Sequence, residues 1–139
     1  MKTKLLLLFL LAFTFTNAQI NVVEGFESGT IPAGWSNNGF NISNTASCSG
    51  SYSCFFNTFG LGSGAELATP TYVSTGGAIT ISCKIKKSNN SGNAIFYLQY
   101  YNFTTNSWID ITNATMSTAC QGLAAVIPAG TIPTGNDVV

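Results

Sequence analysis

Within residues 78–87, the side chains from Ile79 to Lys86 alternate strictly between apolar and polar, and this alternation is the feature that most constrains the fold. A period of two places successive side chains on opposite faces of a β-strand, whereas an amphipathic helix has a period of about 3.6 residues. The apolar positions are Ile79, Ile81, Cys83 and Ile85. We therefore expect a half-buried strand here, with these four side chains facing a core.

The segments that follow have the same period. A polar turn at residues 88–93 leads into an expected strand at residues 94–102, and a loop at residues 104–107 returns the chain through residues 108–112. Together with residues 78–87, these segments predict an antiparallel meander. Shorter strand candidates, separated by Gly, Asn and Pro, are residues 20–26, 39–42, 52–59, 66–73 and 121–127.

The composition also predicts an all-β fold. Only 7% of the 139 residues are charged, and Asn, Ser, Thr and Gly fill most of the polar positions. This mixture favours strands joined by turns over helices. Short strands at this spacing are typical of an antiparallel two-sheet sandwich, and the chain is long enough for one such domain.

Several classes of function are excluded by the residues that the chain lacks. It has no histidine, so Ser-His-Asp triads, Cys-His dyads and His-ligated zinc are impossible. Three lysines beyond the first four residues are too few to neutralise a nucleic-acid backbone. The carboxylates that could act as acid and base are Glu24, Glu27, Glu66 and Asp110, and no spacing pairs them. We therefore predict no catalytic activity and no nucleic-acid partner.

The first residues have the three parts of a secretory signal peptide. Lys2 and Lys4 precede an apolar run at residues 5–15, and Thr16 and Ala18 supply small residues at the minus-three and minus-one positions of a cleavage point after Ala18. The run is about half of the roughly 20 residues that cross a bilayer, so we expect no membrane span. Residues 1–18 are thus predicted to be removed, and residues 19–139 to form a secreted or cell-surface domain.

All four cysteines lie after the signal peptide, and an even number suits an oxidising compartment. The spacing favours a Cys48–Cys54 bridge across a tight turn and a Cys83–Cys120 bridge between strands. Free buried cysteines are an alternative, because Cys83 occupies an apolar position of its strand. A four-thiolate zinc site is a weaker alternative, since the short paired spacings of such sites are missing.

Aromatic residues supply the candidate binding surface. Tyr97, Gln99 and Tyr101 fall on the outward face of the expected strand at residues 94–102, where they could contact an extracellular glycan or protein. Tyrosine on an exposed strand also reflects ordinary β propensity. We expect the two tryptophans, Trp35 and Trp108, to lie in the core, because an indole buries a large apolar area.

Four segments resemble one group of bacterial surface modules. They are residues 24–35 (EGFESGTIPAGW), residues 49–53 (SGSYS), residues 78–87 and residues 94–108. They resemble the cleaved-adhesin and choice-of-anchor jelly-roll modules, relatives of MAM domains, and the leader is similar to those of exported Bacteroidetes proteins. The resemblance covers most of residues 22–128. Family members continue through further strands to an acidic segment, so the resemblance implies a jelly-roll β-sandwich that is incomplete at its C-terminal end.

The resemblance also implies a function and a metal ligand. It points to a non-catalytic extracellular binding or adhesion module, the N-terminal part of a larger secreted or surface protein. A carbohydrate-binding accessory domain of a secreted hydrolase is the alternative. In these modules an acidic residue after the aromatic contributes to a structural calcium site, and that role falls here on Glu27.

Overall fold

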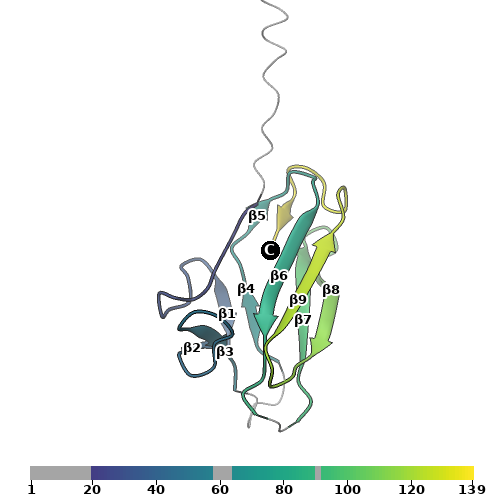
Figure 1. Cartoon of the computed structure of the whole chain (residues 1–139). Helices are drawn as coiled ribbons and strands as arrows, with labels where there is room; N and C mark the ends of the chain where they lie inside the picture. The colour runs from purple at the N-terminus through teal and green to yellow at the C-terminus, as the bar shows by residue number, and fades with distance from the viewer. Residues whose placement is uncertain (1–19, 58–63, 90–91) are drawn as a thin grey trace, which may run out of the picture.

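The computed structural model describes residues 20–57, 64–89 and 92–139, and the predicted signal peptide lies outside these residues. The described residues contain β-strands and no helix, and every strand pair is antiparallel. The all-β prediction is therefore confirmed at this level. Figure 1 shows β6 and β9 in front of β7 and β8, with β1 to β4 to one side.

The strand β6 (Ile79–Ile85) confirms the alternation read from the sequence. Ile79, Ile81 and Cys83 are half-buried and Ile85 is 5% exposed, whereas the polar side chains between them face solvent. Its partner is β9 (Gln121–Ile127), from Ile79 opposite Ile127 to Ile85 opposite Gln121. The predicted meander is wrong at this point, because β6 pairs with this later strand and does not pair with β7.

The next two strands form the expected hairpin. β7 (Ile95–Asn102) pairs with β8 (Ser107–Thr115), and the chain reverses at residues 103–106. A register shift lies between Leu98, opposite Thr112, and Gln99, opposite Asp110, which makes Ile111 an extra residue of β8. The inward phase of β7 is as predicted, with Tyr100 9% exposed.

The core lies between the β6–β9 pair and the strands behind it. It is centred on Tyr100, Ile127, Ile132 and Val138, with half-buried side chains of β5 (Tyr72–Val73), β6 and β8 packed around them. Val138 belongs to β10 (Asp137–Val138), which pairs with β5. The Tyr101 N–H donates to the carbonyl oxygen of Val139, 3.2 Å away, so the end of the chain lies alongside β7.

The N-terminal part contains short strands. β1 (Ser36–Asn38) pairs with β4 (Glu66–Ala68), and β2 (Asn41–Ser43) pairs with β3 (Ser53–Phe55). Residues 20–26 form no strand, contrary to the prediction. Phe26 adopts a φ of 61° and donates its N–H to the Glu24 carboxylate, so residues 24–26 form a local turn that is incompatible with an extended strand.

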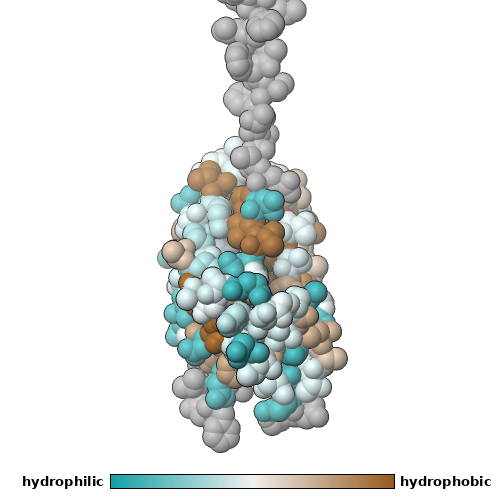
Figure 2. Space-filling view, turned by 60° about the vertical axis from the view of Figure 1, so that its left-hand side comes forward, coloured by the Kyte–Doolittle hydropathy of each residue, from teal (hydrophilic) through white to brown (hydrophobic). Residues whose placement is uncertain are grey.

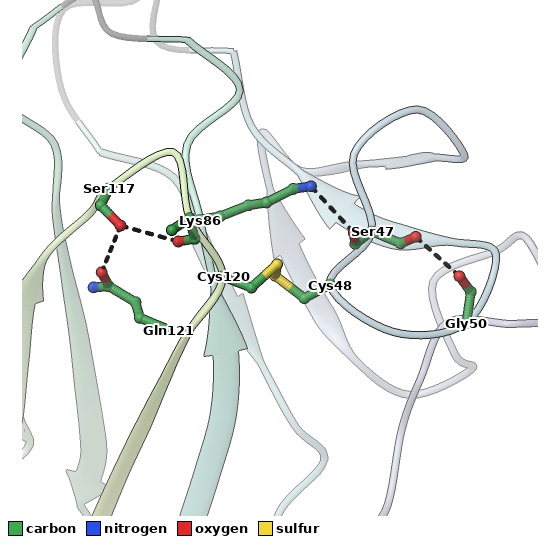
Figure 3. The surroundings of a disulfide bond; sticks show 8 residues. Ser47, Cys48, Gly50, Lys86, Ser117, Cys120 and Gln121 are labelled. Carbon is green, nitrogen blue, oxygen red and sulfur yellow. Dashed lines mark hydrogen bonds between the residues drawn. A yellow bond between two sulfur atoms is a disulfide. The ribbon is translucent and has the colours of Figure 1, made fainter.

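A disulfide joins the N-terminal part of the fold to the segment before β9. It links Cys48 to Cys120, which is neither of the two predicted pairings. Their Cα atoms are 5.6 Å apart, and the ammonium of Lys86 donates to the Ser47 carbonyl oxygen beside the bridge (Figure 3). The bridge fastens the β2–β3 loop to the segment before β9.

Both predicted pairings are therefore wrong. Cys83 lies opposite Leu123 in the β6–β9 ladder, three residues beyond Cys120, and at about 3.3 Å per residue this separation exceeds the reach of a disulfide. Cys54 lies within β3 opposite Ile42, whereas Cys48 lies in the β2–β3 loop and is bonded to Cys120. Cys54 and Cys83 are free thiols.

Exposed large apolar side chains are spread over several strands, among them Val73 on β5, Ile95 on β7 and Val126 on β9. Figure 2 shows a face on which brown, apolar side chains form small separate patches among hydrophilic ones. Within the described residues, no helix is long and apolar enough to cross a membrane.

Candidate ligand-binding site

The outward face of β7 carries the residues that the sequence singled out. Tyr97 is 46% exposed, Gln99 is also exposed, and Tyr101 is half-buried on the same face. They share this face because alternate residues of a strand point to the same side. Tyr97 and Gln99 are thus at the surface and Tyr101 is partly covered, and the role of all three side chains in binding stays a prediction.

β8 adds side chains that the sequence reasoning did not assign to this face. Gln99 lies opposite Asp110 and donates its side-chain N–H to the carboxylate at 2.7 Å. Tyr101 lies opposite Trp108, and its hydroxyl bonds to the Asn106 side chain at 2.6 Å. The polar groups of Gln99 and Tyr101 are thus held within the hairpin, which fixes the orientation of both side chains.

Three aromatic rings meet at the loop end of the hairpin. The Tyr101 ring makes edge-to-face contacts with Phe103, at 4.9 Å between centroids, and with Trp108, at 5.2 Å. Phe103 is 45% exposed. We call Tyr97, Tyr101, Phe103 and Trp108 the hairpin aromatic face. Trp108 was expected in the core; it is half-buried and packs on this outward cluster, since it lies directly opposite Tyr101.

The hairpin aromatic face borders a cleft. One wall is formed by residues 101–104, and the other by residues 131–133 and 135–137. The second wall is bonded to β5, because Ser74 donates its N–H to the Asn136 carbonyl oxygen and accepts the Gly135 N–H, both at 2.8 Å. The buried Ser74 hydroxyl also donates to the Ile132 carbonyl oxygen. One wall therefore belongs to the β7–β8 hairpin, and the other is held by backbone hydrogen bonds to Ser74.

The Glu27 carboxylate accepts hydrogen bonds from backbone N–H groups, whereas a calcium site surrounds the ion with oxygen ligands. Its carboxylate accepts the Ser51 N–H at 2.9 and 3.1 Å and the Tyr52 N–H at 3.2 Å. Backbone N–H groups carry partial positive charge and cannot ligate a cation. Among the described residues no three acidic, Cys or His side chains are grouped to hold a metal. These residues do not fit a calcium shell at Glu27, and its calcium role stays a prediction.

The two free thiols are not reactive groups of this site. Desolvation by burial raises the pKa of Cys54 to about 11, an effect partly offset by a backbone hydrogen bond from Phe55. Burial likewise raises the pKa of Cys83 above its ordinary value. Both groups are neutral thiols at physiological pH, and a neutral thiol is a poor nucleophile and metal ligand.

Comparison with known proteins gives no relative for this chain: no protein family, curated protein or solved structure matches it significantly. The functional argument therefore depends on the residues themselves.

Proposed function

We propose that this protein is a non-catalytic extracellular binding or adhesion module of jelly-roll type, like the cleaved-adhesin modules that its sequence resembles. The ligand contacts the hairpin aromatic face. Packing of the core between the β6–β9 pair and strands β5, β7, β8 and β10 supports a two-layered arrangement. The disulfide and the predicted signal peptide both favour a secreted or surface location.

The observation that carries the proposal is the construction of the hairpin aromatic face. Exposed aromatic side chains supply contact area with few rotatable bonds, so little conformational entropy is lost on binding. Here Tyr101 is held by Asn106 and by two edge-to-face contacts, while Tyr97 and Phe103 remain nearly half exposed. A preorganised surface of this kind binds with a smaller ordering penalty than a flexible one.

The acidic side chains support a non-catalytic role. Glu24 accepts a hydrogen bond from its own turn, Glu27 from residues 51 and 52, and Asp110 from Gln99. These three carboxylates stand in separate places and stabilise local structure. Glycoside hydrolysis, by contrast, uses a pair of carboxylates that flank the scissile bond.

Binding to an array of neutral polysaccharides, acidic polysaccharides and extracellular matrix proteins tests the proposal. The wild-type exported protein is compared with Tyr97→Ser/Phe103→Ser, which removes the two most exposed rings of the face. Val126→Ser is the matched control, because Val126 is 52% exposed on β9 and is not one of the four residues of the hairpin aromatic face.

The proposal expects saturable binding that falls about tenfold or more in the double variant, since each ring contributes apolar contact area. The control variant should bind like wild type. Equal loss in both variants would indicate non-specific adhesion of apolar surface, and the absence of binding to every probe would refute the proposed function.

A further inference from the structure

The cleft beside the hairpin aromatic face combines an exposed ring with polar side chains that have no partner. Phe103 lies on one wall, and Thr131, Asn136 and Asp137 lie on the other. Among the described residues, the side chains of Asn136 and Asp137 make no hydrogen bond, although the Asn136 backbone is bonded to both Ser74 and Pro133. The framework is therefore fixed while these hydrogen-bonding groups are free.

The hairpin wall is also held in place. Asn102 accepts hydrogen bonds from the backbone N–H groups of Thr104 and Thr105, at 2.9 and 3.2 Å. This Asx turn fixes the loop that carries Phe103. The Tyr101 ring contacts Phe103 edge-on and supports it from the strand side. The ring of Phe103 is thus positioned before any ligand arrives.

We propose that this cleft binds one or two residues of a neutral saccharide chain, which names the ligand class of the proposed binding function and depends on that function. A sugar ring offers an apolar C–H face, which packs on Phe103, and an edge of hydroxyl groups. Asp137 accepts from those hydroxyls, and the Asn136 amide both donates and accepts.

The charge of the cleft favours neutral over acidic sugars. The residues that line it include one carboxylate, Asp137, and no lysine. An anionic sugar would place a second negative charge beside Asp137 without a cation to compensate it. A cationic or anionic polymer would also show strongly salt-dependent binding, which a neutral saccharide does not.

Isothermal titration with neutral hexasaccharides tests this assignment, with β-1,4-glucan, β-1,3-glucan, xylan and mannan oligomers as probes. The variants are Phe103→Ala, Asn136→Ala and Asp137→Ala. These truncations leave the backbone bonds of both walls in place, and unchanged melting temperatures verify that the variants fold. Val126→Ser is the control, because Val126 is 52% exposed on β9, lies outside the hairpin aromatic face and does not line the cleft. Tyr97→Ser is compared as well, because Tyr97 belongs to the hairpin aromatic face but does not line the cleft.

The expected result is binding of at least one neutral oligomer that weakens about tenfold in Phe103→Ala and Asp137→Ala, with Val126→Ser within twofold of wild type. Saccharide binding that only Tyr97→Ser weakens would overturn the cleft and leave the binding function standing. Binding of a matrix protein or acidic polysaccharide alone, with no neutral oligomer bound, would do the same. If no probe binds at all, both proposals fail.

Discussion

The carboxylate of Glu27 occupies the space next to Gly50 that a side chain there would need. A Cβ atom added to Gly50 would lie 2.1 Å from Glu27 Oε1, and Gly50 has a φ of 68°. The small residue lets the β2–β3 loop approach Glu27 closely enough for its N–H groups at residues 51 and 52 to bond the carboxylate. This contact attaches the N-terminal segment to the loop that carries Cys48.

Gly50→Ala should therefore destabilise the protein more than Gly130→Ala. Gly130 has a similar φ of 81°, but nothing lies within 4 Å of an added Cβ there. In both variants the free energy of unfolding should fall by about 1 kcal/mol, because alanine is strained in the left-handed backbone conformation. Gly50→Ala also displaces Glu27 from its hydrogen bonds, an additional loss of about 1 to 2 kcal/mol. Chemical denaturation of the two variants measures the difference.

The interaction with Glu27 can be isolated in a double-mutant cycle. In a Glu27→Ala background the hydrogen bonds are already lost, so Gly50→Ala should then lower stability only as much as Gly130→Ala does. If Gly50→Ala has the same effect with and without Glu27, the contact does not hold the loop.

Calcium provides a separate test of Glu27. The hydrogen bonds of Glu27 require no metal, so Glu27→Ala should lower the melting temperature in chelator as well as in calcium. A calcium ion that bound only the folded state would stabilise it by about 2.7 kcal/mol at a hundred times its dissociation constant. A calcium-dependent stabilisation present in wild type and missing in Glu27→Ala would establish the metal role. Equal melting temperatures of wild type in calcium and in chelator would show that Glu27 acts through its hydrogen bonds and not through a metal ion.

The Cys48–Cys120 bridge should be a major contributor to stability. It closes a loop with a sequence separation of 72 residues, for which the chain-entropy model gives about 4 kcal/mol. Cys48→Ser/Cys120→Ser should lower the free energy of unfolding by roughly this amount. Cys83→Ser, which removes no bridge, is the comparison. Non-reducing peptide mapping should recover one peptide pair containing Cys48 and Cys120, and a Cys83–Cys120 pair would contradict the fold.

Cys54 should resist alkylation in the folded protein. Thiolate is the reactive form, and burial raises the pKa of Cys54 from 9.0 to about 11. Below pH 9 both an ordinary thiol and Cys54 are mostly protonated, and at pH 8 the thiolate fraction of Cys54 is lower by about 100-fold. Iodoacetamide labelling should be slow at pH 8, should accelerate as pH rises toward 11, and should reach the ordinary rate in denaturant. Rapid labelling of folded protein at pH 8 would show that Cys54 is accessible and ionised.

Strand positions could be predicted where they depend on an alternation of apolar and polar residues close together in the sequence. The alternation at residues 79–85 and the hairpin of residues 95–115 depend on neighbours in the sequence, and both are present. The pairing of β6 with β9 was not predictable in the same way. Several strands could form hydrogen bonds with β6, and which of them does so depends on the packing of the whole chain. The Cys48–Cys120 bridge could not be predicted for the same reason, because the packing of segments that are distant in the sequence brings the two cysteines together.

The candidate site was partly predictable. Tyr97, Gln99 and Tyr101 followed from the inward phase of Tyr100 and its neighbours. Trp108 could have been placed on the same face, since the short loop sets it opposite Tyr101, but its size suggested the core. The cleft could not be predicted, because residues 131–137 reach it through Ser74 and β5, which are distant in sequence.

The emission of Trp108 tests the binding role of the hairpin aromatic face most directly. The chain has two tryptophans, and Trp35→Phe leaves Trp108 as the only one. Titration of this variant with the strongest ligand from the array should give a saturable change in emission, with a dissociation constant equal to that of wild-type binding. Adding Tyr97→Ser/Phe103→Ser should weaken it about tenfold. Full-affinity binding that leaves Trp108 emission unchanged, and that the double substitution does not weaken, would contradict the account.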